Sequence, residues 1–274
     1  MGIGRAVAAA AIGITGIGLL AACGWNTRTY SDASGVGRSF SSVRFTNDSG
    51  DVTIRTGDRP EVKREVHYGD DQPGEGTFRV KNGVLELDSC GRTNCWIDYE
   101  VTVPAGTSVS GQLDSGTADI TGVSDANVRA SSGDVTIKNV SGAVNVEASS
   151  GSVTLDGIGG QVVAKASSGD VNADGVDGDV TLEASSGSVE ARGIGGATKV
   201  ESSSGGVVVE LTEAADVRVG AQSGNVEVTV PDGAYKVLTS TGSGNVNSDV
   251  ENDPAGDHRL DLHTDSGDIT VSHP

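Results

Sequence analysis

Apolar residues recur along the second half of the chain with a repeat of 18 residues. Serine-glycine turns mark the start of each repeat, at Gly133, Gly151, Gly169, Gly187 and Gly205. In the first two repeats, the second, fourth, seventh, eleventh, thirteenth and fifteenth residues after the glycine are apolar; in the first repeat they are Val135, Ile137, Val140, Val144, Val146 and Ala148. Alternation of apolar and polar residues predicts β-strands, and the glycines that interrupt it twice per repeat predict turns.

A period of this length is typical of a stacked array. We expect each repeat to form one coil of two short strands and two corners, with every inward side chain above its equivalent in the next coil. Glycine at both corners, Gly133 and Gly142 in the first repeat, is expected to allow backbone angles that a β-carbon would forbid. The coils would lie about 4.8 Å apart, and the crossover favours a right-handed path. The predicted fold is therefore all-β: a parallel β-solenoid, a right-handed β-helix of about 18 residues per coil.

The outward positions support this stacking, because like charges on neighbouring strands would repel one another. The residue after the corner glycine alternates between acid and serine: Asp134, Ser152, Asp170, Ser188. Fourteen residues after that glycine, the sequence predicts a cation between two anions: Glu147, Lys165, Glu183. The exceptions are Asp156 beside Asp174 and Glu183 beside Glu201.

Outside the repeats the chain divides into further segments. Residues 38–115 hold strand candidates of irregular length and most of the aromatic residues, which predicts irregular β coils with a hairpin that caps the open end of the solenoid. Residues 116–274 are the predicted solenoid, whose last part would be a longer coil with a loop around Pro254. Residues 23–37, rich in Gly, Ser, Thr and Asp, are predicted to be a flexible tether.

The first 22 residues have the features of an export signal. Arg5 precedes an apolar run from Ala6 to Leu20 that is short for a membrane span. The stretch Leu20-Ala21-Ala22-Cys23 resembles the lipobox of bacterial lipoproteins, and that resemblance implies that Cys23 is lipidated and becomes the mature N-terminus. Two acyl chains suffice for stable anchoring, so we expect the protein on the outer face of the cytoplasmic membrane. The alternative is an ordinary secretory signal cleaved near a cysteine.

Two further cysteines, Cys90 and Cys95, lie in the stretch DSCGRTNCW. An oxidising compartment would pair them, and the bridge would then pin a hairpin turn. A zinc site is the competing interpretation, but no second Cys or His pair at ligand spacing accompanies them.

The net charge of the chain argues against some classes of binding partner. Removal of Arg5 with the signal leaves 18 Lys and Arg against 38 Asp and Glu, a formal charge of −20. This balance argues against nucleic acid and against direct adsorption to anionic lipid. Only Tyr235, of nine aromatic residues, lies beyond residue 100, so the solenoid core must be built from Val, Ile, Leu and Ala.

Recurrent Ser-Gly-Asp-Val-Thr segments carry a family likeness. The stretches NDSGDVTI, SSGDVTI and DSGDITV, together with YEVTVPAGTSV at residues 99–109, resemble the bacterial envelope proteins of unknown function grouped as "putative adhesin" β-strand-repeat proteins. The resemblance covers about residue 40 to the end and brings no catalytic residues. It implies a link to envelope stress and to resistance against cationic antimicrobial peptides, which are associated with some members.

Candidate chemistry is sparse. The sequence has none of the common hydrolase, metalloprotease or phosphate-binding motifs, and no cofactor is expected. A surface ladder at the fifth position after the glycine is the candidate binding or polysaccharide-cleaving site: Lys138, Asp156, Asp174 and Arg192. Alternating surface charge explains these four residues equally well.

Two kinds of metal site are alternatives. Three histidines, His258, His263 and His273, lie among Asp257, Asp261 and Asp265, where solvated loop residues are the simpler interpretation. Stacked calcium sites would need an acid at every corner, whereas the corner acids alternate with serine and Gln161 replaces one; weak calcium binding stays open.

The sequence as a whole predicts a non-enzymatic, lipid-anchored envelope protein that binds, adheres or responds to envelope stress, with cationic peptides or cell-wall components as partners and no nucleic acid. A carbohydrate-active or carbohydrate-binding β-helix and a passive structural spacer are the alternatives.

Overall fold

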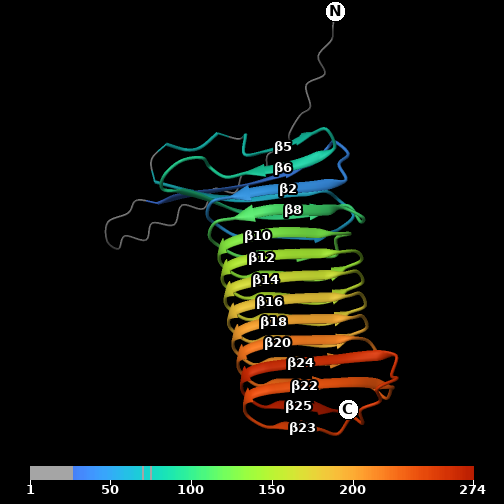
Figure 1. The fold of residues 1–274 in the computed structure, drawn as a ribbon. Coiled ribbons are helices and arrows are strands. Elements are labelled where there is room, and N and C mark those ends of the chain that lie inside the picture. The colour runs from blue at the N-terminus through green and yellow to red at the C-terminus, as the bar shows by residue number, and fades with distance from the viewer. Residues whose placement is uncertain (1–26, 70, 75) are drawn as a thin grey trace, which may run out of the picture.

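The computed structural model describes residues 27–69, 71–74 and 76–274. Their strands form two sheets, of 13 and of 12 strands, that face each other along a column (Figure 1). No helix in this part of the chain has the length and apolar character to cross a membrane. The predicted signal and Cys23 lie outside the described residues.

The central coils each place one strand in either sheet, as the 18-residue repeat predicts. In the 12-stranded sheet they are β10 (Ala126–Ser132), β12 (Val144–Ser150), β14 (Val162–Ser168), β16 (Val180–Ser186), β18 (Thr198–Ser204) and β20 (Val217–Ser223). In the 13-stranded sheet they are β11 (Val135–Val140), β13 (Val153–Ile158), β15 (Val171–Val176), β17 (Val189–Ile194), β19 (Val207–Leu211) and β21 (Val226–Thr229).

Equivalent residues of successive coils lie directly over one another. Val135 pairs with Val153, and Val153 pairs with Val171, in parallel register. All three side chains are fully buried, as are their counterparts on the facing sheet such as Val146 and Ala164. The predicted parallel solenoid with a thin aliphatic core is therefore confirmed.

The N-terminal end is a cap built from parallel and antiparallel strands. Its strands are β1 (Arg28–Gly35), β2 (Ser42–Asn47), β3 (Val52–Thr56), β4 (Glu61–Tyr68), β5 (Phe78–Lys81), β6 (Val84–Asp88), β7 (Cys95–Val103), β8 (Ser108–Leu113) and β9 (Ala118–Thr121). The coil of β6 and β7 stacks outside the coil of β2 and β3, while β8 and β9 stack inside it. Strands β1, β4 and β7 pair antiparallel, and the β5–β6 hairpin covers the end of the other sheet.

The flexible tether predicted for residues 23–37 is wrong for Arg28–Gly35, which forms β1. This strand pairs along its whole length with β4, from Arg28 opposite Tyr68 to Gly35 opposite Glu61. Backbone hydrogen bonding to β4 and the inward Asp32 side chain fix it, and composition alone does not reveal either contact.

A polar contact lies inside the cap, beneath β1 and β4. The Arg64 side chain is only 1% exposed and makes a two-bond ion pair with Asp32, whose side chain is 31% exposed. Arg64 also donates to the Thr77 hydroxyl at 2.5 Å and lies 5.2 Å from the Phe78 ring centroid. Burial alone would lower the pKa of Arg64, but the hydrogen bond and charge of Asp32 outweigh it and raise the pKa. The pair thereby joins β1 to β4 and to the segment that leads into β5.

At the C-terminal end the predicted longer coil is present, since Gly267 follows Gly244 by 23 residues instead of 18, but the last two coils do not stack in chain order. The strands are β22 (Tyr235–Ser243), β23 (Val246–Ser248), β24 (His258–Ser266) and β25 (Ile269–Ser272). Strands β24 and β25 stack directly on β20 and β21, and β22 and β23 form the outermost coil beyond them. Pro254 lies in the exposed connection between β23 and β24.

Glycine serves different purposes at the two corners. The first-corner glycines have strongly positive φ, for example 118° at Gly169. At the second corner the angle is ordinary, and the prediction of special backbone angles there is wrong. A β-carbon on Gly160 would instead lie 2.5 Å from the carbonyl carbon of Gly142 in the neighbouring coil, so the second corner needs glycine because the two backbones approach closely.

A second position with positive φ occurs near the ends of β11, β13, β15 and β17. It is occupied by Asn139 with φ of 53° in β11, by Gly157 in β13, and by Gly175 with φ of 64° in β15. A β-carbon on Gly175 would meet no atom closer than 3.7 Å. The backbone angle is therefore the sole reason for glycine at this place.

We expect Gly175→Ala to lower the free energy of unfolding by about 1 kcal/mol, the cost of the left-handed conformation for an ordinary residue. Gly175→Asn should cost less, because asparagine tolerates this conformation and Asn139 adopts it two coils away. Urea denaturation of the two variants checks this. Equal losses for alanine and asparagine would contradict it.

Candidate functional site

The predicted surface ladder forms one column on the outward face of the 13-stranded sheet. Lys138 pairs in register with Asp156, Asp156 with Asp174, and Asp174 with Arg192, on β11, β13, β15 and β17. The 18-residue repeat thus places the four residues on consecutive strands, as expected.

No ion pair within 4.0 Å joins these four residues to one another. Arg192 turns sideways to Glu190 on its own strand and reaches Glu210 at 3.5 Å, and the hydrogen bond to Glu190 raises the pKa of Arg192. In the described part of the chain, Lys138, Asp156 and Asp174 have no ion-pair partner within 4.0 Å. Two carboxylates therefore lie on neighbouring strands without a cation between them.

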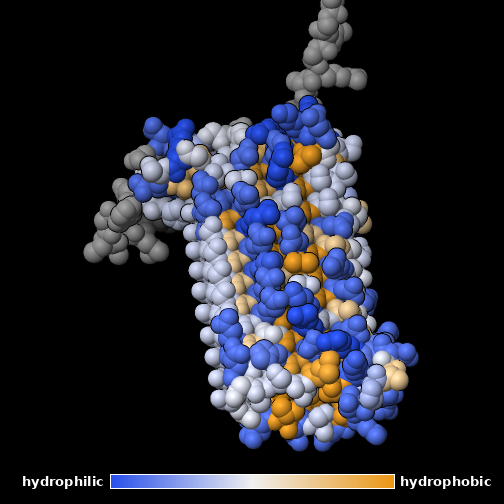
Figure 2. Space-filling view, viewed as in Figure 1, coloured by the Kyte–Doolittle hydropathy of each residue, from blue (hydrophilic) through white to orange (hydrophobic). Residues whose placement is uncertain are grey.

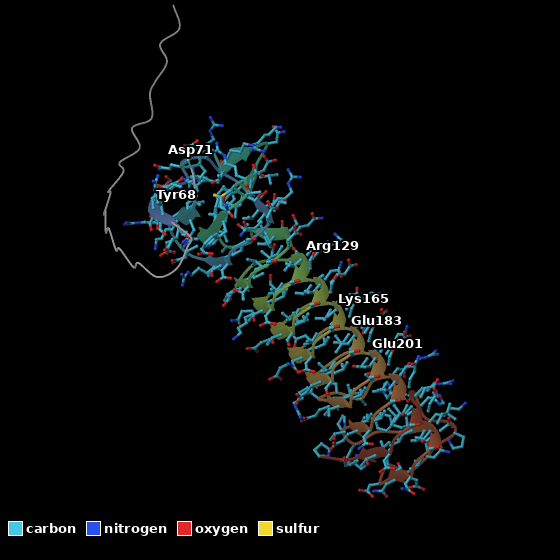
Figure 3. The ribbon with its side chains drawn as sticks, turned by 90° about the vertical axis from the view of Figure 1, so that its left-hand side faces the viewer. Tyr68, Asp71, Arg129, Lys165, Glu183 and Glu201 are labelled. Carbon is cyan, nitrogen blue, oxygen red and sulfur yellow. A yellow bond between two sulfur atoms is a disulfide. The ribbon has the colours of Figure 1, made fainter. Side chains whose placement is uncertain are left out.

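The 12-stranded sheet carries the opposite arrangement, a column of paired charges (Figure 3). Arg129 contacts Glu147 at 2.9 Å, and Lys165 contacts Glu183 at 2.8 Å. The hydrogen bond from Lys165 to Glu183 raises the pKa of Lys165. The expected register of Glu147, Lys165 and Glu183 is present. At the predicted exception, Glu201 lies beside Glu183 and takes Lys199 as its partner at 2.8 Å, which lowers the pKa of Glu201.

Corner carboxylates accept hydrogen bonds from the backbone of the next coil. Asp134 accepts from the backbone N–H of Ser152, and Asp170 from that of Ser188, each at 2.8 Å. At the second corner, Asp179 accepts from the backbone N–H of Ala197 at 3.0 Å. The corner acids therefore help to hold the coils together, a contact that charge repulsion alone did not reveal.

Two adjoining hollows run down the outer face of the 12-stranded sheet, beside the paired column. Their volumes are about 540 and 530 Å³, and Gln161 lines both. Their upper part is lined by short polar side chains such as Asn127 and Asn145, and their lower part by Lys199 and Arg218. Figure 2 shows hydrophilic side chains in a stripe along this face. The sequence pattern marked these positions only as outward and did not reveal a groove.

Cys90 and Cys95 form a disulfide, with their Cα atoms 5.9 Å apart. The bridge does not pin a hairpin, and that part of the prediction is wrong. Cys90 follows β6 and Cys95 begins β7, and these strands belong to different sheets. The disulfide therefore closes a loop at a corner of the cap.

The three C-terminal histidines take part in separate contacts. His263 bonds to Asp265 at 3.0 Å and to the Ser240 hydroxyl at 2.9 Å, His258 lies against the Tyr235 ring, and His273 bonds to the Val230 carbonyl. Among residues 27–69, 71–74 and 76–274, no three His, Cys, Asp or Glu side chains are grouped to hold a metal ion.

The protein is a β-solenoid with an antiparallel cap. Its candidate sites lie on the two long outward faces of the sheets. The chain belongs to the Toastrack DUF4097 family, whose model matches residues 40–272. No curated protein matches it.

Several solved structures match this chain over most of its length. One from Bacteroides fragilis, described as a "putative adhesin", is 13% identical with a TM-score of 0.46, and the match covers 90% of this chain and 97% of that one. Another so described, from Parabacteroides merdae, is 14% identical with a TM-score of 0.33, and covers 91% and 98% of the two chains.

Proposed function

We propose that this protein is a non-enzymatic, lipid-anchored protein of the bacterial envelope, held on the outer face of the cytoplasmic membrane through Cys23. Its acidic solenoid presents a surface for binding, adhesion or the response to envelope stress, and cationic peptides or cell-wall components are its partners. The lipobox-like sequence, the excess of acids and the family membership support this proposal.

The strongest support for the proposal comes from Asp156 and Asp174, whose carboxylates have no ion-pair partner in the described part of the chain. They lie opposite each other on neighbouring parallel strands, where like charges repel. A cation bound from outside would relieve this repulsion. The carboxylates of Glu147 and Glu183 already form ion pairs with Arg129 and Lys165, so an external cation would stabilise them less.

We expect the double variant Asp156→Asn/Asp174→Asn to bind a fluorescent decalysine peptide about fivefold more weakly, since an exposed ion pair contributes up to about 1 kcal/mol. Fluorescence anisotropy at low and at physiological salt measures the affinity. The matched control is Glu147→Gln/Glu183→Gln, which changes the net charge by the same amount and should cost less. Equal losses in the two variants would show attraction by net charge alone and would contradict a role for this column.

Carbohydrate binding is the second candidate, and the groove on the opposite sheet favours it. Side chains such as Asn127, Asn145 and Gln161 offer hydrogen bonds to hydroxyl groups along its length. A cell-wall glycan that binds the parent protein and the Asp156→Asn/Asp174→Asn variant equally well would favour this second function.

A further inference from the structure

The antiparallel strands of the cap project sideways from the column. Within β7, only Tyr99–Val103 pair with β3, so the first residues of β7, together with the end of β4 and the start of β1, run past the start of β3. Figure 1 shows these strands extending from the upper part of the column, and Figure 3 labels Tyr68 near their end.

Aromatic rings gather on both faces of this projection. The His67 and Trp96 rings stack 4.7 Å apart, and the Tyr30 and Tyr68 rings meet edge to face at 6.0 Å. All four side chains are partly exposed. We call these four residues the aromatic tip. The described aromatic residues elsewhere are Phe40, Phe45, Tyr99 and Tyr235, which are buried, and Phe78, which, like Tyr30, is partly buried against the core.

The proposed anchor is close to this tip along the chain. Cys23 precedes Arg28, the first residue of β1, by five positions, and a fully extended chain of that length spans at most about 18 Å. Because residues 28–35 form a strand, they cannot lengthen the connection. If Cys23 carries the lipid, as the proposed function holds, the tip must lie near the membrane surface.

Charge favours the same arrangement. Residues 27–115 contain 10 Lys and Arg against 14 Asp and Glu, whereas residues 116–274 contain 8 against 24. An anionic membrane surface therefore repels the solenoid more strongly than the cap. Tyrosine and tryptophan have an apolar ring with a polar group, which suits the headgroup region.

We propose that the aromatic tip rests in the headgroup region of the membrane to which Cys23 anchors the protein. The inference depends on the proposed lipid anchor and adds a defined contact surface to it. The acidic solenoid then projects its far end away from the lipid.

The mature chain, purified from membranes and carrying Trp25→Phe, leaves Trp96 as its one tryptophan. It is reconstituted into phosphatidylcholine and phosphatidylglycerol vesicles that contain lipids spin-labelled in the headgroup. We expect these lipids to quench Trp96 emission, and Tyr30→Ser/Tyr68→Ser to reduce the quenching. The matched control places the one tryptophan at the far end, as Leu238→Trp with Trp25→Phe and Trp96→Phe, and should not be quenched.

Intact-mass spectrometry of the purified chain distinguishes failure of the proposed anchor from failure of the proposed tip contact. A mature chain without a diacylglyceryl group on Cys23 would overturn the anchor and the inference together. A chain that carries the lipid, yet whose Trp96 is quenched no more than tryptophan at position 238, would overturn the inference and leave the anchor in place.

Discussion

Gly169→Ala is expected to lower the free energy of unfolding by about 3 kcal/mol, because strained backbone conformations cost about 1–3 kcal/mol and a steric clash adds to them. The φ of Gly169 is 118°, outside even the left-handed region that asparagine tolerates. A β-carbon there would also lie 2.2 Å from the carbonyl oxygen of Gly151 in the neighbouring coil. The backbone cannot move aside easily, because the Gly169 N–H donates to the Ser186 carbonyl at 3.0 Å in the coil on the other side.

Urea denaturation measures this loss, and Ser167→Ala, an exposed change two residues away, is the control that should lie within about 0.5 kcal/mol of the parent. Gly169→Asn should be as damaging as Gly169→Ala, in contrast to the milder effect expected of asparagine at Gly175. A loss below about 1 kcal/mol for Gly169→Ala would show that the stacked corner relaxes and that the close approach of the two glycines is not rigid.

The central coils follow from the sequence because their geometry is set by spacing. A strand with alternating apolar residues has only one way to bury them, and an invariant repeat places equivalent residues in the same position of each coil. Val135, Val153 and Val171 were therefore predictable as one buried stack. The left-handed position of Gly175 was not recognised, although Asp-Gly at 156–157 and at 174–175 was a signal that could have revealed it.

The order of coils at the two ends could not be predicted in the same way. The inward residues of β24 are Leu260, Leu262 and Thr264. They pair with inward residues of β20 on one side and of β22 on the other, so the pattern fits either neighbour equally well. An apolar pattern identifies which side chains face inward but not which coil lies next. Stacking in chain order is the simplest assumption, and both ends of this solenoid depart from it.

The candidate site was predictable in its placement but not in its contacts. Register brought Lys138, Asp156, Asp174 and Arg192 into one column. The direction of a long side chain depends on every charge within reach, and Arg192 contacts Glu190 and Glu210, which are not among the four predicted residues. The groove on the other sheet depends on differences in side-chain size between neighbouring columns, which the apolar repeat does not encode.

Arg64→Met is expected to lower the free energy of unfolding by about 2 kcal/mol. Removal of one partner from a fully buried ion pair costs about 3–5 kcal/mol, and the partial exposure of Asp32 reduces that figure. Methionine keeps most of the side-chain volume against Phe78, so the loss reports mainly the charge and hydrogen bonds. The uncompensated Asp32 carboxylate would then disfavour the docking of β1 on β4.

The same change also tests whether the cap unfolds as a separate unit. In a solenoid each coil contacts only its neighbours, so the damage should stay local. Amide hydrogen exchange should accelerate in β1 and β4 and stay unchanged in β14 and β15, several coils away. Asp32→Ser combined with Arg64→Met should recover part of the lost stability, because the unpaired carboxylate is gone. Uniform acceleration along the column would instead mean that Arg64 stabilises the whole solenoid, and an additive double variant would mean that the ion pair with Asp32 is not the cause.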